Sequence, residues 1–598
     1  MPGELKAAFA PLPRTARGQP IVLNGRADKK TFLYVHGSNV FLRNIENPMI
    51  CDVYTEHSKT TTVAQYSPSG FYIASADTIG KVRIWDTVNV EHVLKNEFQP
   101  LSGSIKDLCW SGDNQRIVVG GEGREKYAHV FNADTGTSVG EVTGQSKSVN
   151  AVSFKQDRPF RIATASEDQT LCFFEGPPFK YHHTIHDHKN FVNCVRYSPN
   201  SQKFVSGGAD GRAFVYDGKT GEKVGELGDP AHKGGIYGVS FSSNSLEVLT
   251  VSADKTAKIW NMENFENVCQ FTLGTALLDM QVGCLWLGDF ILTVSLSGNI
   301  NYLDRSNPSS PSQIIKGHNK QIEGIIAAGD TLYSADSEGK ICVWDANTGT
   351  CTEVTGKGHS VQIKSISLMD DKLITCAIDD TVKVVDLSSQ SYSDISIAMG
   401  SQPQCVATSA DGHIVVACLQ SVNIIQNGQL LFKQDVKYEP KCVAIHPSQS
   451  EIAVGGGQDS KIHIYSLTSG TLQETKTLSA PAAVTCVSYS PDGAYLAAGS
   501  ERKVLLYSGP EYEVVISTQW VSHTARVMCL SWSPNSQHVA SGSLDTDINI
   551  WDVNNHAARL SIKKAHKMSV VSSLSWRSDN ELVSAGHDSI VQLWNISF

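Results

Sequence analysis

The sequence lacks several features that define large classes of proteins. It contains no run of about 18 apolar residues, and its first residues, Met1 to Lys6, include no signal-peptide core. We therefore expect a cytoplasmic protein without a membrane partner. The 14 cysteines form no CxxC pair, and several fall at expected strand positions, among them Cys109, Cys194, Cys342 and Cys486. This spacing indicates buried free thiols rather than disulfides or zinc ligands.

An excess of positive charge is lacking as well. Lys and Arg number 50 against 60 Asp and Glu, which gives a formal net charge of −10. That balance argues against a nucleic-acid partner. No Ser/His/Asp arrangement and no pair of carboxylates stands outside the repeat described next. We therefore expect neither an enzyme nor a bound cofactor.

The chain instead carries one motif from end to end. A Ser-x-Asp sequence followed by a Trp-Asp ending returns about every 43 residues, and its clearest copies are Ser252–Asn261 and Ser543–Asp552. An aromatic or aliphatic residue fills the Trp position in each of fourteen copies, which lie 40 to 46 residues apart. These residues are Phe41, Trp85, Phe131, Phe174, Tyr216, Trp260, Leu303, Trp344, Val385, Ile425, Tyr465, Tyr507, Trp551 and Trp594.

This period, with four strand-like runs and a Trp-Asp ending in each copy, is typical of WD40 β-propeller blades. One ring usually holds about four to eight blades, so fourteen blades indicate two rings of seven. An apolar content of 41% over 598 residues is enough for two large cores. We predict an all-β protein with one seven-bladed propeller over residues 19–312 and a second over residues 313–598.

The last repeat is incomplete. It ends at Trp594–Phe598, which is its third strand, so its outer fourth strand is missing. An open blade edge would be a pairing hazard. We expect the N-terminal segment 1–18 to supply a strand that closes the second propeller.

Most histidines that stand out have a structural explanation. Seven open a repeat, and a buried imidazole there can bond to a later Ser or Thr and to the Asp of the turn. They are His57, His188, His232, His318, His359, His523 and His566. A cluster at His182, His183, His186 and His188 has the composition of a metal site, but strand alternation would separate its side chains. We therefore expect no metal.

Four residues depart from the habits of the repeat and are candidates for a binding surface. Phe191 occupies a slot that is small or polar in other copies, which suggests a contact surface, although packing against a neighbouring loop is an equal alternative. Glu167 precedes the framework residue Asp168 and is expected to project outward, although a merely solvated charge is an equal alternative. Glu125 has two interpretations, since it can replace the framework Asp of its blade. Tyr181 lies on the outer strand of the blade of Glu167 and can simply pack there. We expect these four to form one acidic and aromatic patch.

Several segments resemble the actin-interacting protein 1 family, whose members are also called WD-repeat protein 1. The most specific is Phe174–Lys180, with the sequence FEGPPFK, and further matches are Leu12–Gly18, Tyr54–His57, Gly121–Glu125 and Gly455–Ser460. The resemblance implies two seven-bladed propellers and two partners, actin filaments and the filament-severing protein cofilin. It also implies that the chain enhances cofilin-dependent severing and disassembly of filaments in the actin cytoskeleton.

Carried over to this sequence, the functional patch of the family falls on Glu125, Glu167, Tyr181 and Phe191. Glu167 stands where relatives can have Asp, and Tyr181 where they can have Phe, so the chemistry of both positions is kept. We expect a monomer. The alternatives are a generic WD40 interaction scaffold, which would need a docking segment outside the rings, and a propeller hydrolase, which would need catalytic groups in a channel.

Overall fold

The structure is a computed structural model that describes residues 3–49, 51–468 and 471–597. Within these ranges the chain forms fourteen antiparallel sheets, thirteen of four strands and one of three. Contacts divide it into two compact units, Leu12–Asn319 and a second unit that joins the residues up to Pro11 with those from Lys320 onward. Each unit holds seven sheets. This arrangement confirms the two seven-bladed propellers, which are called the first and the second propeller below.

The strands of the first propeller, grouped by blade, are β2 (Asn24–Gly25), β3 (Thr31–His36), β4 (Asn39–Asn44) and β5 (Cys51–Tyr54); β6 (Thr61–Tyr66), β7 (Tyr72–Asp77), β8 (Val82–Asp86) and β9 (Leu94–Phe98); β10 (Ile105–Trp110), β11 (Arg116–Gly121) and β12 (Ala128–Asn132); β13 (Val149–Phe154), β14 (Arg161–Ser166), β15 (Leu171–Glu175) and β16 (Lys180–Ile185); β17 (Val192–Tyr197), β18 (Lys203–Gly208), β19 (Ala213–Asp217) and β20 (Lys223–Glu226); β21 (Ile236–Phe241), β22 (Glu247–Ser252), β23 (Thr256–Asn261) and β24 (Asn267–Thr272); β25 (Gln281–Leu287), β26 (Phe290–Ser295), β27 (Ile300–Leu303) and β28 (Gln313–Ile315). A single 3-10 turn among the described residues, η1 (Leu277–Asp279), precedes β25.

The strands of the second propeller are β29 (Ile322–Ala328), β30 (Thr331–Asp336), β31 (Ile341–Asp345) and β32 (Cys351–Glu353); β33 (Ile363–Met369), β34 (Lys372–Ala377), β35 (Thr381–Asp386) and β36 (Ser391–Ala398); β37 (Pro403–Thr408), β38 (Ile414–Cys418), β39 (Ser421–Gln426) and β40 (Gln429–Asp435); β41 (Pro440–Ile445), β42 (Glu451–Gly456), β43 (Lys461–Thr468) and β44 (Thr471–Ser479); β45 (Val484–Tyr489), β46 (Tyr495–Ser500), β47 (Lys503–Ser508) and β48 (Glu513–Ile516); β49 (Val527–Trp532), β50 (His538–Ser543), β51 (Ile548–Asp552) and β52 (Arg559–Ile562); β53 (Val571–Ser578), β54 (Glu581–Gly586) and β55 (Val591–Asn595), with β1 (Glu4–Phe9).

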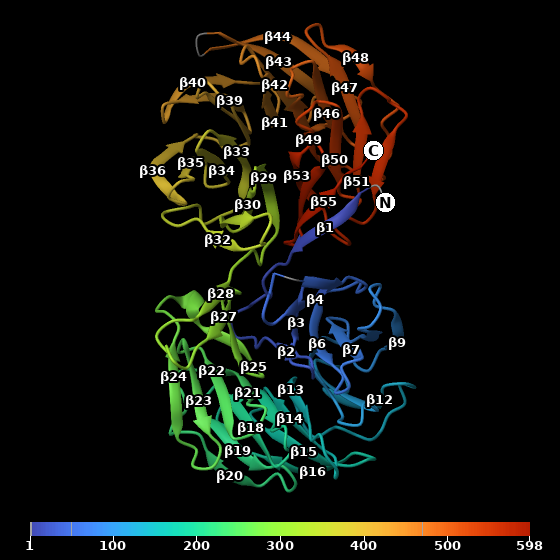
Figure 1. Cartoon of the computed structure of the whole chain (residues 1–598), viewed down its shortest axis with the longest axis vertical. Helices are drawn as coiled ribbons and strands as arrows, with labels where there is room; N and C mark the ends of the chain where they lie inside the picture. The colour runs from blue at the N-terminus through green and yellow to red at the C-terminus, as the bar shows by residue number, and fades with distance from the viewer. Residues whose placement is uncertain (1–2, 50, 469–470, 598) are drawn as a thin grey trace. The chain divides into compact units, whose positions relative to one another are not determined.

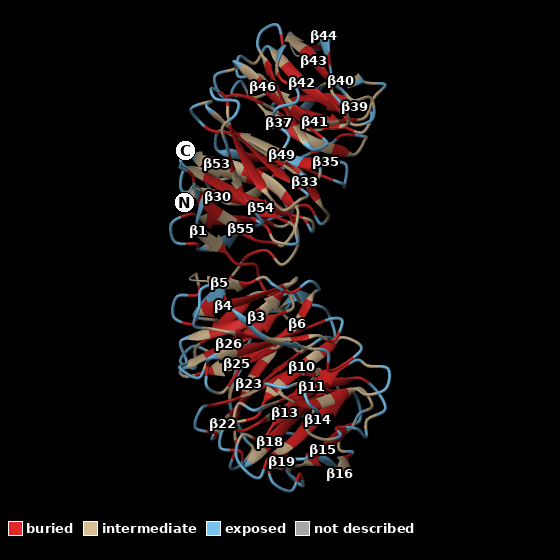
Figure 2. Cartoon of the chain, turned by 90° about the vertical axis from the view of Figure 1, so that its right-hand side faces the viewer, coloured by how far each residue is buried: buried red, intermediate tan, exposed pale blue. Residues whose placement is uncertain are grey.

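The residue at the Trp position lies on the third strand of its blade in all fourteen copies, and each of these side chains is buried. Apolar residues on both faces of the middle strands pack against the neighbouring blades. Almost every residue of a second strand is therefore buried, as in β22. Figure 2 shows this pattern as buried strands within exposed loops. The first strands contact one another in ring order in both propellers, and they surround the centre of each ring.

The second propeller is closed by a strand from the other end of the chain. β1 pairs antiparallel with β55, with Glu4 opposite Asn595 and Phe9 opposite Val591, and Figure 1 shows the two strands side by side. The ring of Phe9 is buried, 5.7 Å from the ring of Trp344 in the adjacent blade. β1 thus occupies the outer position that the last repeat lacks.

The sequence predicts boundaries between residues 18 and 19 and between residues 312 and 313. The two units instead divide between Pro11 and Leu12 and between Asn319 and Lys320. Leu12 donates its backbone N–H to the carbonyl of His318 at 2.7 Å, and the hydroxyl of Thr15 donates to the carbonyl of Leu296 at 2.5 Å, so residues 12–18 belong to the first propeller. At the other boundary, β28 pairs with β27 and completes a blade of the first propeller. Both corrections arise from hydrogen bonds between segments far apart in the sequence.

One blade departs from the expected four strands. After β12 the chain makes a single bridge, from Phe131 to Ser138, and then turns to the next blade. There the N–H of Phe179 donates to the carbonyl of Val139 at 2.8 Å, and the N–H of Glu141 donates to the carbonyl of Phe179 at 3.0 Å. The fourth run of this repeat is therefore divided between two blades.

Both bonds expected of a repeat-opening histidine are present at His188, His232, His359, His523 and His566, whereas Nδ1 of His57 lies 3.7 Å from the carboxylate of Asp77. His232 contacts the Thr250 hydroxyl through Nε2 at 2.8 Å and the Asp254 carboxylate through Nδ1 at 3.1 Å, while Trp260 donates to Thr250 at 2.8 Å. Burial raises the pKa of Asp254, but hydrogen bonds from His232 and Thr256 outweigh it and hold the pKa well below its usual range. The two histidine bonds recur at His188, His523 and His566, and the Trp bond recurs at His523 and His566. Buried polar groups thus stabilise the turns of these blades.

Candidate interaction face of the first propeller

Two kinds of turn lie together at one end of each blade, namely the turn before the first strand and the turn between the second and third strands. Backbone bonds join them: Ala209 donates to the carbonyl of Phe191 at 2.8 Å, and Glu167 donates to the carbonyl of Ser148 at 3.0 Å. We call this end of the first propeller its upper face. Glu125, Glu167 and Phe191 all lie in such turns, on three consecutive blades.

Phe191 is exposed at 43% on the upper face. The equivalent backbone bonds place Ser148 and Gly235 in its slot on the two adjacent blades. The charged group of Lys147 lies 6.0 Å from the centre of the Phe191 ring, and the N–H of Phe191 is bonded to the side chain of Asn190. At this exposure the ring leaves apolar area open to water.

Glu167 does project from its turn, but it is not isolated. Lys106 on β10 donates to its carboxylate at 2.7 Å and to the side-chain oxygen of Asn150 at 3.1 Å, and it lies 3.7 Å from Glu122. The side chain of Glu167 remains 33% exposed, and that of Glu122 59%. Lys106 therefore neutralises part of an acidic cluster whose remaining carboxylate surface faces solvent.

Glu125 lies in the turn between β11 and β12 and is exposed. The framework Asp of other blades accepts hydrogen bonds from backbone N–H groups, as Asp168 does from Thr170 in its own turn at 3.0 Å and from Ser146 in the adjacent turn at 2.7 Å. The carboxylate of Glu125 accepts no such bond from the described residues. The turn also carries Lys126. Burial, and to a smaller extent the charge of Lys126, lowers the pKa of His129 to about 4.

Tyr181 lies apart from the other three. It stands on the outer strand β16, opposite Phe174, and its hydroxyl bonds to the hydroxyl of Thr184 at 2.9 Å. Its ring is 50% exposed and packs against the edge of the Phe174 ring at 6.3 Å. Tyr181 therefore belongs to the side wall of its blade rather than to the turns of the upper face.

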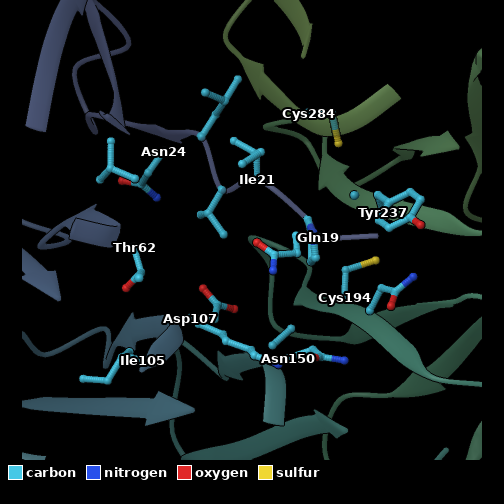
Figure 3. A pocket seen from close by; sticks show the side chains of 18 of the residues that line it. Gln19, Ile21, Asn24, Thr62, Ile105, Asp107, Asn150, Cys194, Tyr237 and Cys284 are labelled. Carbon is cyan, nitrogen blue, oxygen red and sulfur yellow. Dashed lines mark hydrogen bonds between the residues drawn. The ribbon is translucent and has the colours of Figure 1, made fainter. Parts of the chain in front are cut away.

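The upper face opens into the centre of the first propeller. A hollow of about 860 Å³ there is lined by Lys106, Glu122, Glu167 and Phe191, among others, but by neither Glu125 nor Tyr181. Figure 3 shows side chains from successive first strands around it, with the segment that carries Gln19, Ile21 and Asn24 alongside. The structure therefore brings Glu167 and Phe191 to one mouth.

A buried ion pair stabilises the wall of this hollow. Arg196 donates to the carboxylate of Asp107 at 2.7 Å, and the N–H of Val152 donates to the same carboxylate at 2.9 Å. Burial raises the pKa of Asp107, although the guanidinium of Arg196 opposes the rise. The two charges largely satisfy each other, which indicates a structural role for the pair.

The histidine cluster forms no metal site among the residues that the structure describes. His182 and His183 contact each other through their Nδ1 atoms at 2.6 Å, whereas His188 is part of the framework of its blade. None of the described residues form a helix that is long and apolar enough to span a membrane.

Sequence reasoning missed Lys106, the cation that holds Glu167. Lys106 precedes Glu167 by 61 residues and comes from another blade. No local pattern marks such a pair, because the ring packing alone brings the two blades together. The alternation of β10 could at most have indicated that Lys106 faces away from the neighbouring core residues.

The fold and its bonding network define a WD40-repeat protein with two seven-bladed propellers. The family model for the WD domain, G-beta repeat, matches residues 136–175, 179–217, 221–261, 472–508, 515–552 and 558–595. Across the full length, the chain is 49% identical to Actin-interacting protein 1 of Drosophila melanogaster over 597 residues, which are 99% of this chain and 98% of the relative. It is 46% identical to WD repeat-containing protein 1 of Xenopus tropicalis and 45% identical to that of Gallus gallus, with 100% of each chain covered. The chain belongs to this family of actin-interacting protein 1 and WD repeat-containing protein 1.

Proposed function

We propose that the chain binds actin filaments and enhances their cofilin-dependent severing and disassembly. The observation that carries the proposal is the full-length similarity to a protein named Actin-interacting protein 1, at 49% identity. The upper face of the first propeller supports it with an exposed aromatic side chain next to exposed carboxylates. The docking residues of the proposal are Glu125, Glu167, Tyr181 and Phe191.

The chemistry of the upper face suits a protein partner. A partner that covers Phe191 removes apolar area from water, and aromatic anchors of this kind dominate many interfaces. Glu167 and Glu122 next to it offer carboxylates to basic side chains at the rim, where charges chiefly steer association and set specificity. Tyr181 extends the contact from the upper face onto the side wall of the blade.

A binding protein of this kind can promote disassembly without breaking covalent bonds. If the upper face binds the lattice of a cofilin-decorated filament better than the bare lattice, binding shifts the filament toward the decorated state. The effect depends on this difference in affinity, because equal affinity for both lattices would shift nothing. The proposal therefore requires cofilin for activity.

Sedimentation of actin filaments tests the function, with the purified chain present or absent and with cofilin present or absent. We expect loss of pelleted actin beyond that caused by cofilin alone only when both proteins are added. If the chain leaves the pellet unchanged in every condition, the proposed function is wrong and a generic scaffold becomes the better interpretation.

Two pairs of variants test the face. Phe191→Ser introduces the residue that the adjacent blade has in the same slot, and Phe71→Ser is its control, since Phe71 is 58% exposed in a turn at the opposite end of a blade. Glu167→Ala is paired with Glu175→Ala, at the far end of the same blade. We expect Phe191→Ser to lower cofilin-dependent disassembly by about tenfold and Glu167→Ala by less. Equal activity within both pairs would place the docking surface elsewhere.

A further inference from the structure

Two arginines on the upper face of the first propeller have no ion-pair partner among the residues that the structure describes. Arg14 and Arg17 are exposed, and among the described residues neither guanidinium has a hydrogen-bond or ion-pair partner. Lys106 and Lys95, for comparison, each contact a carboxylate at 2.7 Å.

The segment that carries the two arginines is held firmly by the propeller. The backbone of Leu12 bonds to His318 at 2.7 Å and accepts a bond from Nδ1 of His36 at 2.8 Å, and Thr15 bonds to the carbonyl of Leu296 at 2.5 Å. Further along, Ile21 donates to the carbonyl of Val282 at 2.8 Å. The arginine side chains therefore extend from a fixed backbone, and their positions cost a partner little ordering of the main chain.

Arg14 and Arg17 line the same hollow as Glu167, Glu122 and Phe191. Its mouth thus has a cationic part, from the segment that precedes the first blade, and an acidic and aromatic part from the third to fifth blades. Two other cations line the hollow, and both are engaged: Lys106 by Glu167 and Asn150, and Arg196 by Asp107. Among the described residues that line the hollow, Arg14 and Arg17 are therefore the cations available to a partner.

The chemistry of the two parts favours a protein segment over a small polyanion. Guanidinium groups bind carboxylates in a bidentate manner. A free polyphosphate in the hollow would also meet Asp107, Glu122 and Glu167, which line it and would repel its charge. A protein segment can present carboxylates to one side of the mouth and apolar or basic groups to the other.

We propose that Arg14 and Arg17 are a second contact of the upper face and bind carboxylates on the same filament partner that covers Phe191. This inference rests on the proposed function and extends it. The docking face then has a cationic part and an acidic part, and the partner segment is acidic where it meets Arg14 and Arg17. The contact with these arginines is electrostatic and solvent-accessible, so its contribution falls as salt screens it.

Cosedimentation with cofilin-decorated actin filaments tests the proposal, using the full chain and the variants Arg14→Glu, Arg17→Glu and the double variant. Lys219→Glu is the control, because Lys219 is exposed at the opposite end of the same propeller and its reversal changes the net charge equally. We expect the double variant to bind about tenfold more weakly, with each single variant intermediate and Lys219→Glu unchanged. Arg14→Lys with Arg17→Lys should retain part of the affinity.

The salt dependence adds a second measurement. The affinity of the unaltered chain should decrease more steeply with salt than that of the double variant, because the latter has lost the screened contact. If the unaltered chain does not bind filaments at all, the proposed function itself fails. If it binds, and the double variant binds as well as Lys219→Glu with the same salt dependence, the role of Arg14 and Arg17 is overturned while the proposed function stands.

Discussion

The two propellers share one blade design but close their rings differently. The blades of the first propeller follow one another in sequence, and its first blade meets its seventh without a strand from elsewhere. The second propeller incorporates β1 into the sheet of β53, β54 and β55, from the other end of the chain. Blade formation is therefore a local property of each repeat, whereas closure of the second ring depends on a contact between residues nearly 600 positions apart.

The slot of Phe191 differs between single blades of the two propellers. In the sixth blade of the second propeller the same backbone bond, from Leu544 to the carbonyl of Arg526 at 3.0 Å, places a charged side chain there, and in the seventh blade the bond from His587 to the carbonyl of Val570 at 3.1 Å places a smaller apolar one. An aromatic ring in this slot exposes apolar area, whereas an arginine is readily hydrated. The comparison teaches that the framework is common to both rings, while closure and surface chemistry distinguish them.

The largest effect should follow from breaking the closure. Phe9→Ala removes a buried ring that packs against Trp344 within the second propeller. We expect a loss of about 3 kcal/mol in the free energy of unfolding of that propeller, with little change in the first. Hydrogen exchange followed separately in the two propellers measures this, and Leu5→Ala, at an exposed position of the same strand, is the control. Equal destabilisation of both propellers would contradict the difference in closure.

A smaller and equal effect is expected when the common framework is broken in either ring. Thr250→Val in the first propeller and Ser541→Ala in the second each remove the hydroxyl that contacts both a histidine and a Trp N–H. Each change leaves buried polar groups unpaired and should lower the free energy of unfolding of its own propeller by about 2 kcal/mol. Thermal and denaturant unfolding of the two variants give the comparison. A cost confined to one of the rings would show that the blades are not equivalent.

The smallest effect is a difference in how the stability of the two propellers depends on pH. Burial is the largest cause that lowers the pKa of three histidines in each propeller, namely His129, His183 and His232 in the first and His359, His523 and His538 in the second. A histidine whose folded pKa lies below the unfolded value of about 6.5 destabilises the fold as the pH falls below that value. In the first propeller His92 acts in the opposite direction: burial lowers its pKa, but the carboxylate of Asp52 at 2.9 Å outweighs this and raises it, so its protonation stabilises the fold.

The stabilisation from His92 is complete below about pH 6.5, so the first propeller should lose it as the pH rises above that value through the raised folded pKa. Hydrogen exchange of each ring at several pH values tests this, with rates corrected for the intrinsic effect of pH. His92→Asn should remove this loss from the first propeller and leave the second propeller unchanged. A first propeller whose pH profile above about pH 6.5 is the same with and without His92 would contradict the assignment.

The sequence was sufficient for those features that repeat. Trp260 and Trp551 mark third strands, and His232 and His523 bond as expected, because each blade specifies them through residues close in the chain. Features that depend on contacts between blades were not accessible. Residues 12–18 bond to the last blade of the first propeller, and the run after β12 joins the next blade instead of completing its own.

The candidate surface likewise combines features that one blade determines with features that contacts between blades determine. The exposure of Phe191 follows from its departure from the repeat, which a single blade reveals. The ion pair between Lys106 and Glu167 and the free charges of Arg14 and Arg17 follow from ring packing, which brings distant segments to one mouth. Tyr181 shares a blade with Glu167, but its place on the outer strand β16, opposite Phe174, separates it from the turns of the upper face.

The most direct test of the account compares the same slot in the two propellers. Phe191→Ser and Arg526→Ser give both rings the small polar residue that Ser148 represents elsewhere, and each variant is cosedimented with bare and with cofilin-decorated actin filaments. The account predicts that the unaltered chain and Arg526→Ser pellet preferentially with decorated filaments, and that Phe191→Ser loses about tenfold in affinity for them. Loss of binding in Arg526→Ser, with Phe191→Ser unchanged, would contradict the assignment of the docking face to the first propeller.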